Sequence, residues 1–380
     1  MSKLKIESVD AYVAGHWLFV SVTTDTGLTG IGEATYFIYP RAAALIVEEL
    51  ADYYKGADPF RAEYLFNGAF KSHCMRDSAY MSALSAIDQA LWDIKGKALG
   101  VPVWELLGGR VRDRVRAILL IEAQTKEEIL QKARAAAAEG FSAIKLKPFV
   151  GEWASLTRAK LFAQTAEIIS AVRTDLGADM DIAIEIHRNL TPNDAIEFAA
   201  LIADQSPYFI EDPILPFSVE SNRYVSDKIG MPVAIAERNT TIWEFREYSD
   251  CHGVAILRPD VGLAGGFTQM KKIAAIAESR HQRIVPHNFT SPVATACHIQ
   301  LAASTSNWDV QGYVREDRQP WTDVVKSINV LKNGYLEIPE TPGIGVELNM
   351  DYLKTAPYVP FGSKFGHGAL TGADGAFKHQ

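Results

Sequence analysis

The sequence predicts an α/β fold in which eight parallel strands close a barrel, accompanied by a smaller α+β domain. Two observations lead to this prediction. From about Arg114 onward, short apolar runs alternate with amphipathic helical patterns, which is typical of a parallel sheet. In addition, 380 residues exceed what one compact core usually holds, so a barrel of about 250 residues and a second domain are expected.

The segment before the barrel is predicted to form the α+β unit. Residues 4–13 and 17–24 have strand character, and the glycine-rich stretch 24–34 supplies turn chemistry. Helical patterns begin near Arg41, and residues 80–100 carry apolar side chains at helical spacing. We therefore expect a small sheet covered by helices in this part of the chain.

The change of rhythm sets the domain boundaries that we expect. Residues 1–112 form the capping α+β domain, and residues 113–320 form the barrel. The last stretch, 321–380, is rich in Gly and Pro and has no clear barrel element. We expect it to fold back over the first domain and to complete it.

The barrel segment supplies eight strand candidates separated by helices. Thr125 followed by Glu128 is a capping-box pattern, and Thr191 with Pro192 marks a second helix start. A long amphipathic helix is expected over residues 153–176. The strand candidates lie near residues 116, 143, 183, 209, 234, 255, 284 and 309.

Three glutamates, Glu185, Glu211 and Glu237, each close an apolar run that we predict to be a strand. They lie 26 residues apart, and Asp260 and His287 follow at similar steps. The C-terminal ends of parallel barrel strands meet at one rim, where such folds hold their catalytic groups. Converging carboxylate oxygens at this solvent-facing rim suit Mg²⁺. The pattern therefore predicts a metal-dependent enzyme.

Composition excludes several other classes of protein. A net charge of −8 gives no electrostatic case for a nucleic-acid partner. Cys74, Cys251 and Cys297 are odd in number and widely spaced, which argues against a disulfide framework or a structural zinc site. The start lacks the apolar stretch of a signal peptide, and no run of 18 apolar residues occurs. We expect a cytoplasmic protein without a membrane partner.

Short motifs follow one another in order along nearly the whole chain. Around the candidate residues they read "AIKLKP", "EIH", "IEDP", "AERN", "RPD" and "VPHN", and elsewhere "GIGEA", "IDQALWDIKGKALGVPVWELLGG", "GLAGGFTQMKKIAAIAE" and "PGIGVEL". Together they resemble the enolase superfamily, in its mandelate racemase/muconate lactonizing enzyme-like branch, and within it the acid-sugar dehydratases of galactonate and mannonate type. The resemblance implies a modified TIM barrel, (β/α)7β, with an N-terminal α+β capping domain.

The resemblance also implies a substrate carboxylate bound to Mg²⁺, removal of the proton on the adjacent carbon, and a metal-stabilised enediolate. Glu185, Glu211 and Glu237 are then the metal ligands. His287 and Asp260 match the family's His–Asp pair, in which the carboxylate orients the imidazole as a base. A lone histidine at a barrel rim is more often structural, so this assignment depends on the pairing.

Three further residues receive catalytic roles from the resemblance. His187 lies two residues beyond Glu185, hence on the same side of an extended segment, and corresponds to the acid that protonates the leaving β-hydroxyl. Lys145 and Lys147 point the same way from one strand, toward the barrel mouth. Lys147 would be an acid/base opposite His287, and Lys145 would support the substrate carboxylate. A hydrogen-bonding role for His187 and a solvated lysine pair are the alternatives.

Substrate contacts are predicted from the neighbours of these residues and from the first domain. Asn189 follows His187 by two positions, and Asn288 lies beside the proposed base. Either could instead be a loop hydrogen-bonder. In the first domain we single out, as candidates for a lid over the site, Trp17, Arg76, His16 and His73.

Two positions depart from the family pattern. Glu185 stands where the first ligand is usually Asp, and it is one methylene longer. Gly312 stands where a Glu usually hydrogen-bonds the enediolate. Loss of one such donor costs on the order of 10² to 10³ in rate. Either Glu316 or water substitutes, or the substrate differs from those of the known dehydratases.

We therefore predict a Mg²⁺-dependent dehydratase that converts a sugar acid into a 2-keto-3-deoxy acid. The alternatives are a racemase or epimerase of a 2-hydroxy acid, for which Lys147 and His287 would serve opposite faces, and a catalytically impaired binding protein, which Gly312 makes conceivable. The partner is a small carboxylate, and we also expect a homo-oligomer.

Overall fold

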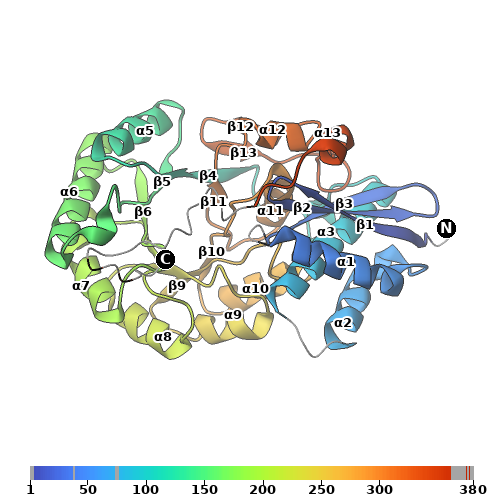
Figure 1. The fold of residues 1–380 in the computed structure, drawn as a ribbon, viewed down its shortest axis with the longest axis horizontal. Coiled ribbons are helices and arrows are strands. Elements are labelled where there is room, and N and C mark those ends of the chain that lie inside the picture. The colour runs from blue at the N-terminus through green and yellow to red at the C-terminus, as the bar shows by residue number, and fades with distance from the viewer. Residues whose placement is uncertain (1–3, 37–38, 73–76, 361–373, 375, 377–380) are drawn as a thin grey trace.

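The computed structural model describes residues 4–36, 39–72, 77–360, 374 and 376. A barrel with an outer layer of helices lies beside a smaller sheet-and-helix unit that contains the N-terminal part of the chain (Figure 1). In the described part of the chain, no helix is both long and apolar enough to span a membrane.

The N-terminal unit is built on an antiparallel sheet of three strands in the order β1-β2-β3. Gly30 and Gly32 on β3 are required by the helix that covers it. A Cβ at either position would lie 2.1 Å from a backbone oxygen, that of Ala90 or of Ala86. The glycine motif therefore lets this sheet and helix α3 approach backbone to backbone. The strands are β1 (Ile6–Ala14), β2 (Trp17–Thr24) and β3 (Thr29–Ala34).

Helix α3 is buried on nearly all sides because it lies between this sheet and helix α10 of the barrel. It begins after Asp77, whose side chain accepts a hydrogen bond from Tyr80 N, and ends at Gly100 with φ of 72°. The helices of this unit are α1 (Pro40–Tyr54), α2 (Ala62–Ser72), which follows a 3₁₀ turn at Pro59–Arg61, α3 (Ser78–Leu99) and α4 (Val103–Leu106).

The eight predicted strands are present and parallel. Strands β4 to β10 pair in sequence order, β11 pairs with β4, and a bridge between Ile284 and Trp308 joins the last two strand regions. The barrel is therefore closed, which confirms the predicted fold class. The strands are β4 (Arg114–Ile121), β5 (Ala143–Leu146), β6 (Asp181–Glu185), β7 (Ile210–Glu211), β8 (Val233–Ile235), β9 (Val254–Leu257), β10 (Arg283–Ile284) and β11 (Gln311–Tyr313).

Each of the eight strand regions contributes one buried apolar side chain to the barrel interior. These residues form a separate core cluster: Ile118, Ala143, Ala183, Phe209, Ala234, Ile256, Val285 and Val310. Because this layer seals the barrel, the polar residues that follow it along the strands are confined to the C-terminal rim.

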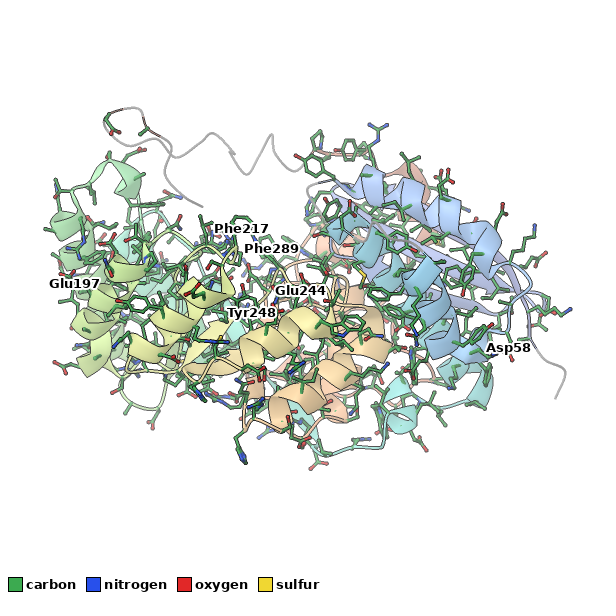
Figure 2. The ribbon with its side chains drawn as sticks, turned by 90° about the horizontal axis from the view of Figure 1, so that it is seen from below. Asp58, Glu197, Phe217, Glu244, Tyr248 and Phe289 are labelled. Carbon is green, nitrogen blue, oxygen red and sulfur yellow. The ribbon has the colours of Figure 1, made fainter. Side chains whose placement is uncertain are left out.

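Helices surround the barrel, as Figure 1 shows. Thr125 and Thr191 cap their helices as predicted, but the capping box expected at Thr125 is incomplete, because the Glu128 side chain accepts from Gln124 N. Helix α9 begins with a complete capping box between Thr241 and Glu244, the latter labelled in Figure 2. The helices are α5 (Lys126–Ala138), α6 (Arg158–Leu176), α7 (Pro192–Ile202), which a 3₁₀ turn at Ala203–Gln205 follows, α8 (Val219–Lys228), α9 (Ile242–Ser249), α10 (Gly266–Glu278) and α11 (Pro292–Ala303).

Two predictions about elements were wrong. The helix expected over 153–176 is a 3₁₀ turn at Trp153–Ser155 followed by α6, because Leu156 and Thr157 have extended backbone between them. The tail contributes a hairpin whose strand β13 pairs antiparallel with β4, so it extends the barrel sheet. The tail elements are α12 (Trp321–Val324), β12 (Leu331–Lys332), β13 (Tyr335–Glu337) and α13 (Met350–Thr355).

Beyond this hairpin the tail does return to the N-terminal unit. Gly343 bridges to Pro102, and Tyr358 bridges to Gly15. The tail therefore contacts both parts of the molecule, and the boundaries at 112 and 320 stay a prediction.

Candidate active site

The three glutamates lie at the C-terminal ends of adjacent strands. Glu185 closes β6, Glu211 closes β7, and Glu237 follows β8 by two residues. We expected them to face bulk solvent, and this prediction was wrong. Their side chains are only 7%, 0% and 10% exposed. The reason is that long basic side chains cover them.

Three basic side chains contact these carboxylates directly among the described residues. Lys145 Nζ lies 2.9 Å from Glu185 Oε2 and 2.5 Å from Glu211 Oε1. Arg258 Nη1 lies 3.0 Å from Glu211 Oε2, and its Nη2 lies 3.7 Å from Glu237 Oε2. The third cation is Arg188, whose Nη1 pairs with Glu237 Oε1 and lies 3.2 Å from Asp212 Oδ2.

The charges of this cluster are interdependent. Burial alone would raise the pKa of Glu185, but the Lys145 ammonium holds it below its usual value. Burial raises the pKa of Asp212, and the negative charge of Glu237 adds to this shift despite the nearby Arg188. The raised pKa of Asp212 therefore reflects its burial beside other carboxylates.

The three carboxylates are of the chemical type that binds Mg²⁺, but their oxygens do not converge on one metal position. Glu185 Oε2 and Glu211 Oε2 are buried, and each lies against a cation, Lys145 or Arg258, without a well-aligned hydrogen bond among the described residues. Hard carboxylate oxygens of this kind are what Mg²⁺ takes as ligands. However, within the described ranges no three His, Cys, Asp or Glu side chains converge closely enough to hold a metal as they stand. All three glutamates are engaged by basic side chains, Glu237 by two guanidinium groups.

His287 and Asp260 form the predicted contact. His287 Nδ1 lies 2.6 Å from Asp260 Oδ2, while Asp260 Oδ1 accepts hydrogen bonds from Thr35 Oγ1 at 2.7 Å and from Gly262 N at 2.8 Å. Burial alone would lower the pKa of His287, but Glu237 and the Asp260 hydrogen bond outweigh it and raise the pKa. The pair therefore fixes the ring and leaves Nε2 for proton exchange.

His187 does not lie on an extended segment with Glu185. Its φ of 55° turns the chain, and its Nε2 accepts a hydrogen bond from Arg188 Nη2. Burial, and then the charge of Arg188, lower the pKa of His187 to about 3. In this arrangement the imidazole is neutral, and the proton that it can give is the one on Nδ1.

Backbone strain concentrates at this rim. His187, Arg188, Asp212 and Ala236 are non-glycine residues with positive φ, and they directly follow strands β6, β7 and β8 or lie within three residues of them. Such conformations persist where the surroundings impose them, typically at functional sites. The strain therefore marks the same rim as the carboxylates do.

Lys147 lies at the mouth of the barrel, as its alternation with Lys145 predicts. Its Nζ is 3.6 Å from Glu122 Oε1 and 6.0 Å from the centre of the Phe289 ring. Lys145, in contrast, is committed to two glutamates. The two lysines are therefore not equivalent, and Lys147 is the one with freedom to meet a substrate.

The two asparagines make hydrogen bonds within the protein. Asn189 Nδ2 donates to Ile186 O at 2.9 Å, and Asn288 Nδ2 donates to Thr295 Oγ1 at 2.6 Å and to Gly312 O at 3.0 Å. The Oδ1 atoms of both are buried without a partner among the described residues. Their substrate contacts stay a prediction.

Position 312 has room for a side chain. A Cβ on Gly312 would lie 3.5 Å from Pro286 O and 3.6 Å from Asn288 Cβ, which is ordinary contact. Glu316, the suggested replacement, is buried, and desolvation raises its pKa to about 7. It accepts a hydrogen bond from Thr295.

The proposed lid residues are placed only in part. Trp17 is buried against Trp321, with ring centres 6.2 Å apart, and Trp321 Nε1 donates to Thr290 O behind the loop that follows His287. His16 packs on Trp17. Arg76 and His73 lie outside the described residues.

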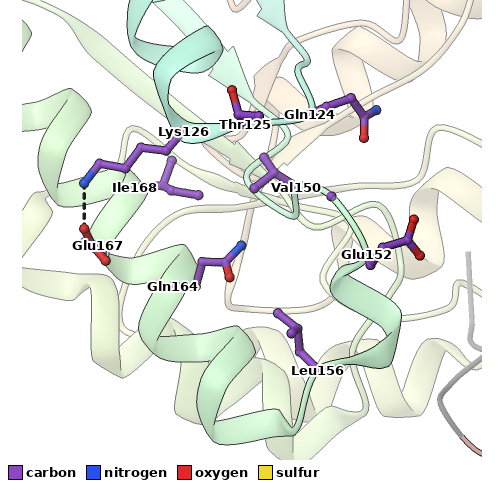
Figure 3. Close-up of a pocket in the computed structure, with 10 residues that line it drawn as sticks. Gln124, Thr125, Lys126, Val150, Glu152, Leu156, Gln164, Glu167 and Ile168 are labelled. Atoms are coloured by element: carbon purple, nitrogen blue, oxygen red, sulfur yellow. Dashed lines mark hydrogen bonds and ion pairs between the residues drawn. The ribbon is translucent and has the colours of Figure 1, made fainter.

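A groove of about 310 Å³ opens beside this rim but contains none of the proposed catalytic residues. It lies between the start of α5 and helix α6, and an ion pair of 2.6 Å joins Lys126 to Glu167 there (Figure 3). The groove thus gives no reason to move the site away from the strand ends.

Sequence reasoning missed three residues of the site. Arg188 and Asp212 immediately follow predicted ligand or acid residues, and Arg258 precedes Asp260 by two positions. The alternation along the strand that ends at "RPD" was a usable signal for Arg258. Arg188 carried no such signal, because its direction depends on positive φ values.

Two family models together match most of the chain. The N-terminal domain of mandelate racemase/muconate lactonizing enzyme matches residues 7–108, and the enolase C-terminal domain-like family matches residues 128–352. D-Galactonate dehydratase of Ralstonia nicotianae is 32% identical over 354 residues, which cover 91% of this chain and 92% of the relative. That of Variovorax paradoxus is 32% identical and covers 94% and 95%.

Solved structures give the same result. A member of the enolase superfamily from Salmonella Typhimurium has a TM-score of 0.88 at 28% identity, covering 93% of this chain and 98% of its own. An enolase from Agrobacterium radiobacter, provisionally assigned as a galactarate dehydratase and solved with Na and L-malate, has a TM-score of 0.92 at 27% identity and covers 99% and 100%.

Proposed function

The chain belongs to the enolase superfamily, with the N-terminal domain of mandelate racemase and muconate lactonizing enzyme, and we propose that it is a hydro-lyase that dehydrates a sugar acid. The relatives named D-galactonate dehydratase support this reaction. The single observation that carries it is the His287–Asp260 pair beside a buried cluster of carboxylates and cations. A base next to positive charge suits removal of a proton beside a carboxylate.

His287 would take the proton from the carbon next to the substrate carboxylate. Asp260 holds Nδ1, so Nε2 is the atom that accepts it. The negative charge left behind spreads onto the substrate carboxylate, and the Lys145 ammonium is placed among the glutamates to stabilise it. Glu185, Glu211 and Glu237 would hold Mg²⁺, which supplies Lewis-acid stabilisation of the same charge when bound.

Loss of the β-hydroxyl completes the reaction. His187 would protonate this group as it leaves, and the resulting enol then rearranges to a 2-keto-3-deoxy acid. Racemisation or epimerisation of a 2-hydroxy acid is the second candidate. It is favoured by the loosely held ammonium of Lys147, which could return a proton to the opposite face.

A screen of a sugar-acid library tests the proposal. The enzyme is incubated with Mg²⁺ and each of a set of diastereomeric sugar acids that includes galactonate and galactarate, and 2-keto acid formation is measured. We expect product from one or a few of them. Exchange of the α-proton with deuterated solvent without keto acid would instead support the second candidate.

Glu211→Gln is the matched variant for this screen. It removes one charge from between Lys145 and Arg258 and should lower turnover by on the order of 10² to 10³. Circular dichroism checks that the variant stays folded, since Glu211 is fully buried. A folded variant with wild-type turnover would remove the carboxylate cluster from the mechanism.

A further inference from the structure

Arg188 has an unusual place for a buried guanidinium. It belongs to the loop between β6 and α7, its φ is 68°, and its side chain is only 3% exposed. Its backbone N donates to Asp212 O at 2.7 Å. The chain therefore holds a bulky residue in a conformation that favours glycine and turns its charge toward the strand ends.

The contacts of Arg188 are concentrated on groups with proposed roles. Nη1 pairs with Glu237 Oε1 and with Asp212 Oδ2, and Nη2 donates to His187 Nε2. One guanidinium thus contacts both a proposed metal ligand, Glu237, and the proposed acid, His187. Its Nε is buried and is left without a hydrogen bond among the described residues.

The other two cations of the cluster are built into the barrel. Arg258 directly follows β9, its backbone N donates to Ile235 O, and its side chain is 2% exposed. Lys145 lies within β5. Of these three cations, Arg188 lies farthest from its strand, three residues beyond the end of β6, so its side chain can withdraw with the least effect on a strand.

Glu237 is the carboxylate that this cation controls. Its Oε1 pairs with Arg188 Nη1, and its Oε2 lies 3.7 Å from Arg258 Nη2, whereas Glu185 and Glu211 both pair with Lys145. A divalent cation placed against Glu237 would meet the positive charge of Arg188 at short range. The metal and Arg188 therefore cannot share this carboxylate at low cost.

We propose that Arg188 is a resident cation that competes with Mg²⁺ for Glu237, so that metal binding requires the guanidinium to withdraw. This inference rests on the Mg²⁺ dependence proposed above. Withdrawal also releases His187 Nε2, so metal binding and the availability of this imidazole are coupled through one side chain. The apparent metal affinity is lowered by the fraction of molecules in which Arg188 occupies Glu237.

Titration calorimetry of Mg²⁺ into the metal-free protein tests the competition. R188G removes the cation and suits the positive φ, and R188M removes the charge but keeps most of the side-chain volume. If Arg188 occupies Glu237 in nine molecules of ten or more, both variants should bind Mg²⁺ at least about tenfold more tightly than the wild type. The metal-free variants should melt at a lower temperature, and Mg²⁺ should raise that temperature more than it does in the wild type.

R315G is the matched control. Arg315 also has a positive φ, 61°, and pairs with a glutamate, Glu139, that is not one of the proposed metal ligands. The R315G variant should bind Mg²⁺ with the same affinity as the wild type. Equal affinity in the wild type, R188G and R188M, or weaker binding in both variants, overturns the proposal alone. Absence of Mg²⁺ binding in all of them overturns it together with the metal part of the proposed function.

Discussion

At the scale of single residues, the site is set by which nitrogen of each histidine is free. His287 has Nδ1 engaged by Asp260, and His187 has Nε2 engaged by Arg188. A base needs an unprotonated nitrogen that faces the substrate, and an acid needs a proton on it. The two histidines are therefore suited to different steps, and His287 is the better candidate for the base.

The two steps can be separated by isotope exchange. In deuterated buffer with a turned-over sugar acid, His287→Asn should abolish both α-proton exchange and product. His187→Asn should keep exchange while product formation falls by about 10² or more. His252 lies in an exposed loop, so His252→Asn is the control for replacing a histidine by asparagine outside the site. Exchange at the wild-type rate in the His287 variant would make Lys147 the base.

The sequence predicted where the site residues lie along the strands better than it predicted which side chains they contact. Glu185 and Glu211 could be placed because strand ends recur at the spacing of a β/α unit. The pairing of Arg188 with Glu237 could not, because it depends on positive φ values that no periodicity reveals. For the tail, the sequence did contain a hairpin signal. Asn333–Gly334 adopts positive φ at both positions, as a two-residue hairpin requires, but its strands are too short to show a pattern.

At the scale of elements, helix starts are specified by local hydrogen bonds. The capping box of α9 combines a hydrogen bond from Glu244 N to Thr241 Oγ1 with one from Thr241 N to Glu244 Oε2. The same carboxylate also accepts from Thr240 N. Helix α6, in contrast, begins after Thr157, whose side chain makes no such bond. The two threonines therefore offer a direct comparison.

Thr241→Ala should lower the free energy of unfolding by about 1 kcal/mol, within a range of roughly 0.5–2 kcal/mol, because the backbone N–H of Glu244 loses its acceptor. Thr157→Ala should cost clearly less. Urea unfolding followed by circular dichroism measures both. Equal losses in the two variants would show that the side-chain cap does not determine the stability of α9.

At the scale of the whole molecule, the N-terminal unit is joined to the barrel through buried polar groups. Glu33 Oε2 accepts hydrogen bonds from Ser291 Oγ and from Ala294 N at the start of α11. Glu33 Oε1 is buried without a partner among the described residues. Burial outweighs these hydrogen bonds and raises the pKa of Glu33 to about 8. This carboxyl group therefore holds its proton more tightly in the folded protein than an exposed glutamate does.

A raised pKa in the folded state has a defined effect on stability. Below the unfolded value of about 4.5, Glu33 is protonated in both states and costs nothing. As pH rises from about 4.5 to 8, only the unfolded state releases the proton, so stability falls by on the order of 3–5 kcal/mol. Glu33→Gln keeps a hydrogen-bond acceptor and cannot ionise. The variant should therefore lose less free energy of unfolding between pH 5 and pH 8 than the wild type does.

Urea unfolding midpoints at pH 5 and pH 8 measure this difference. Glu48→Gln, on the exposed face of α1, is the control and should follow the wild type. If Glu33→Gln loses as much stability as the wild type over this range, Glu33 is not the group that couples pH to folding.

The hydrogen bond from Thr35 to Asp260 has a consequence for protein engineering. The aspartate that orients the candidate base belongs to the barrel, but one of its oxygens is held by a hydroxyl from the other unit. The catalytic apparatus is therefore divided between two parts of the chain that a designer would treat as separate modules. A chimera that joins this barrel to the first domain of a relative keeps both hydrogen bonds to Asp260 Oδ1 only if the transplanted segment places a hydroxyl at position 35. Recombination libraries for new substrates should fix that residue and vary the remainder of the transplanted unit.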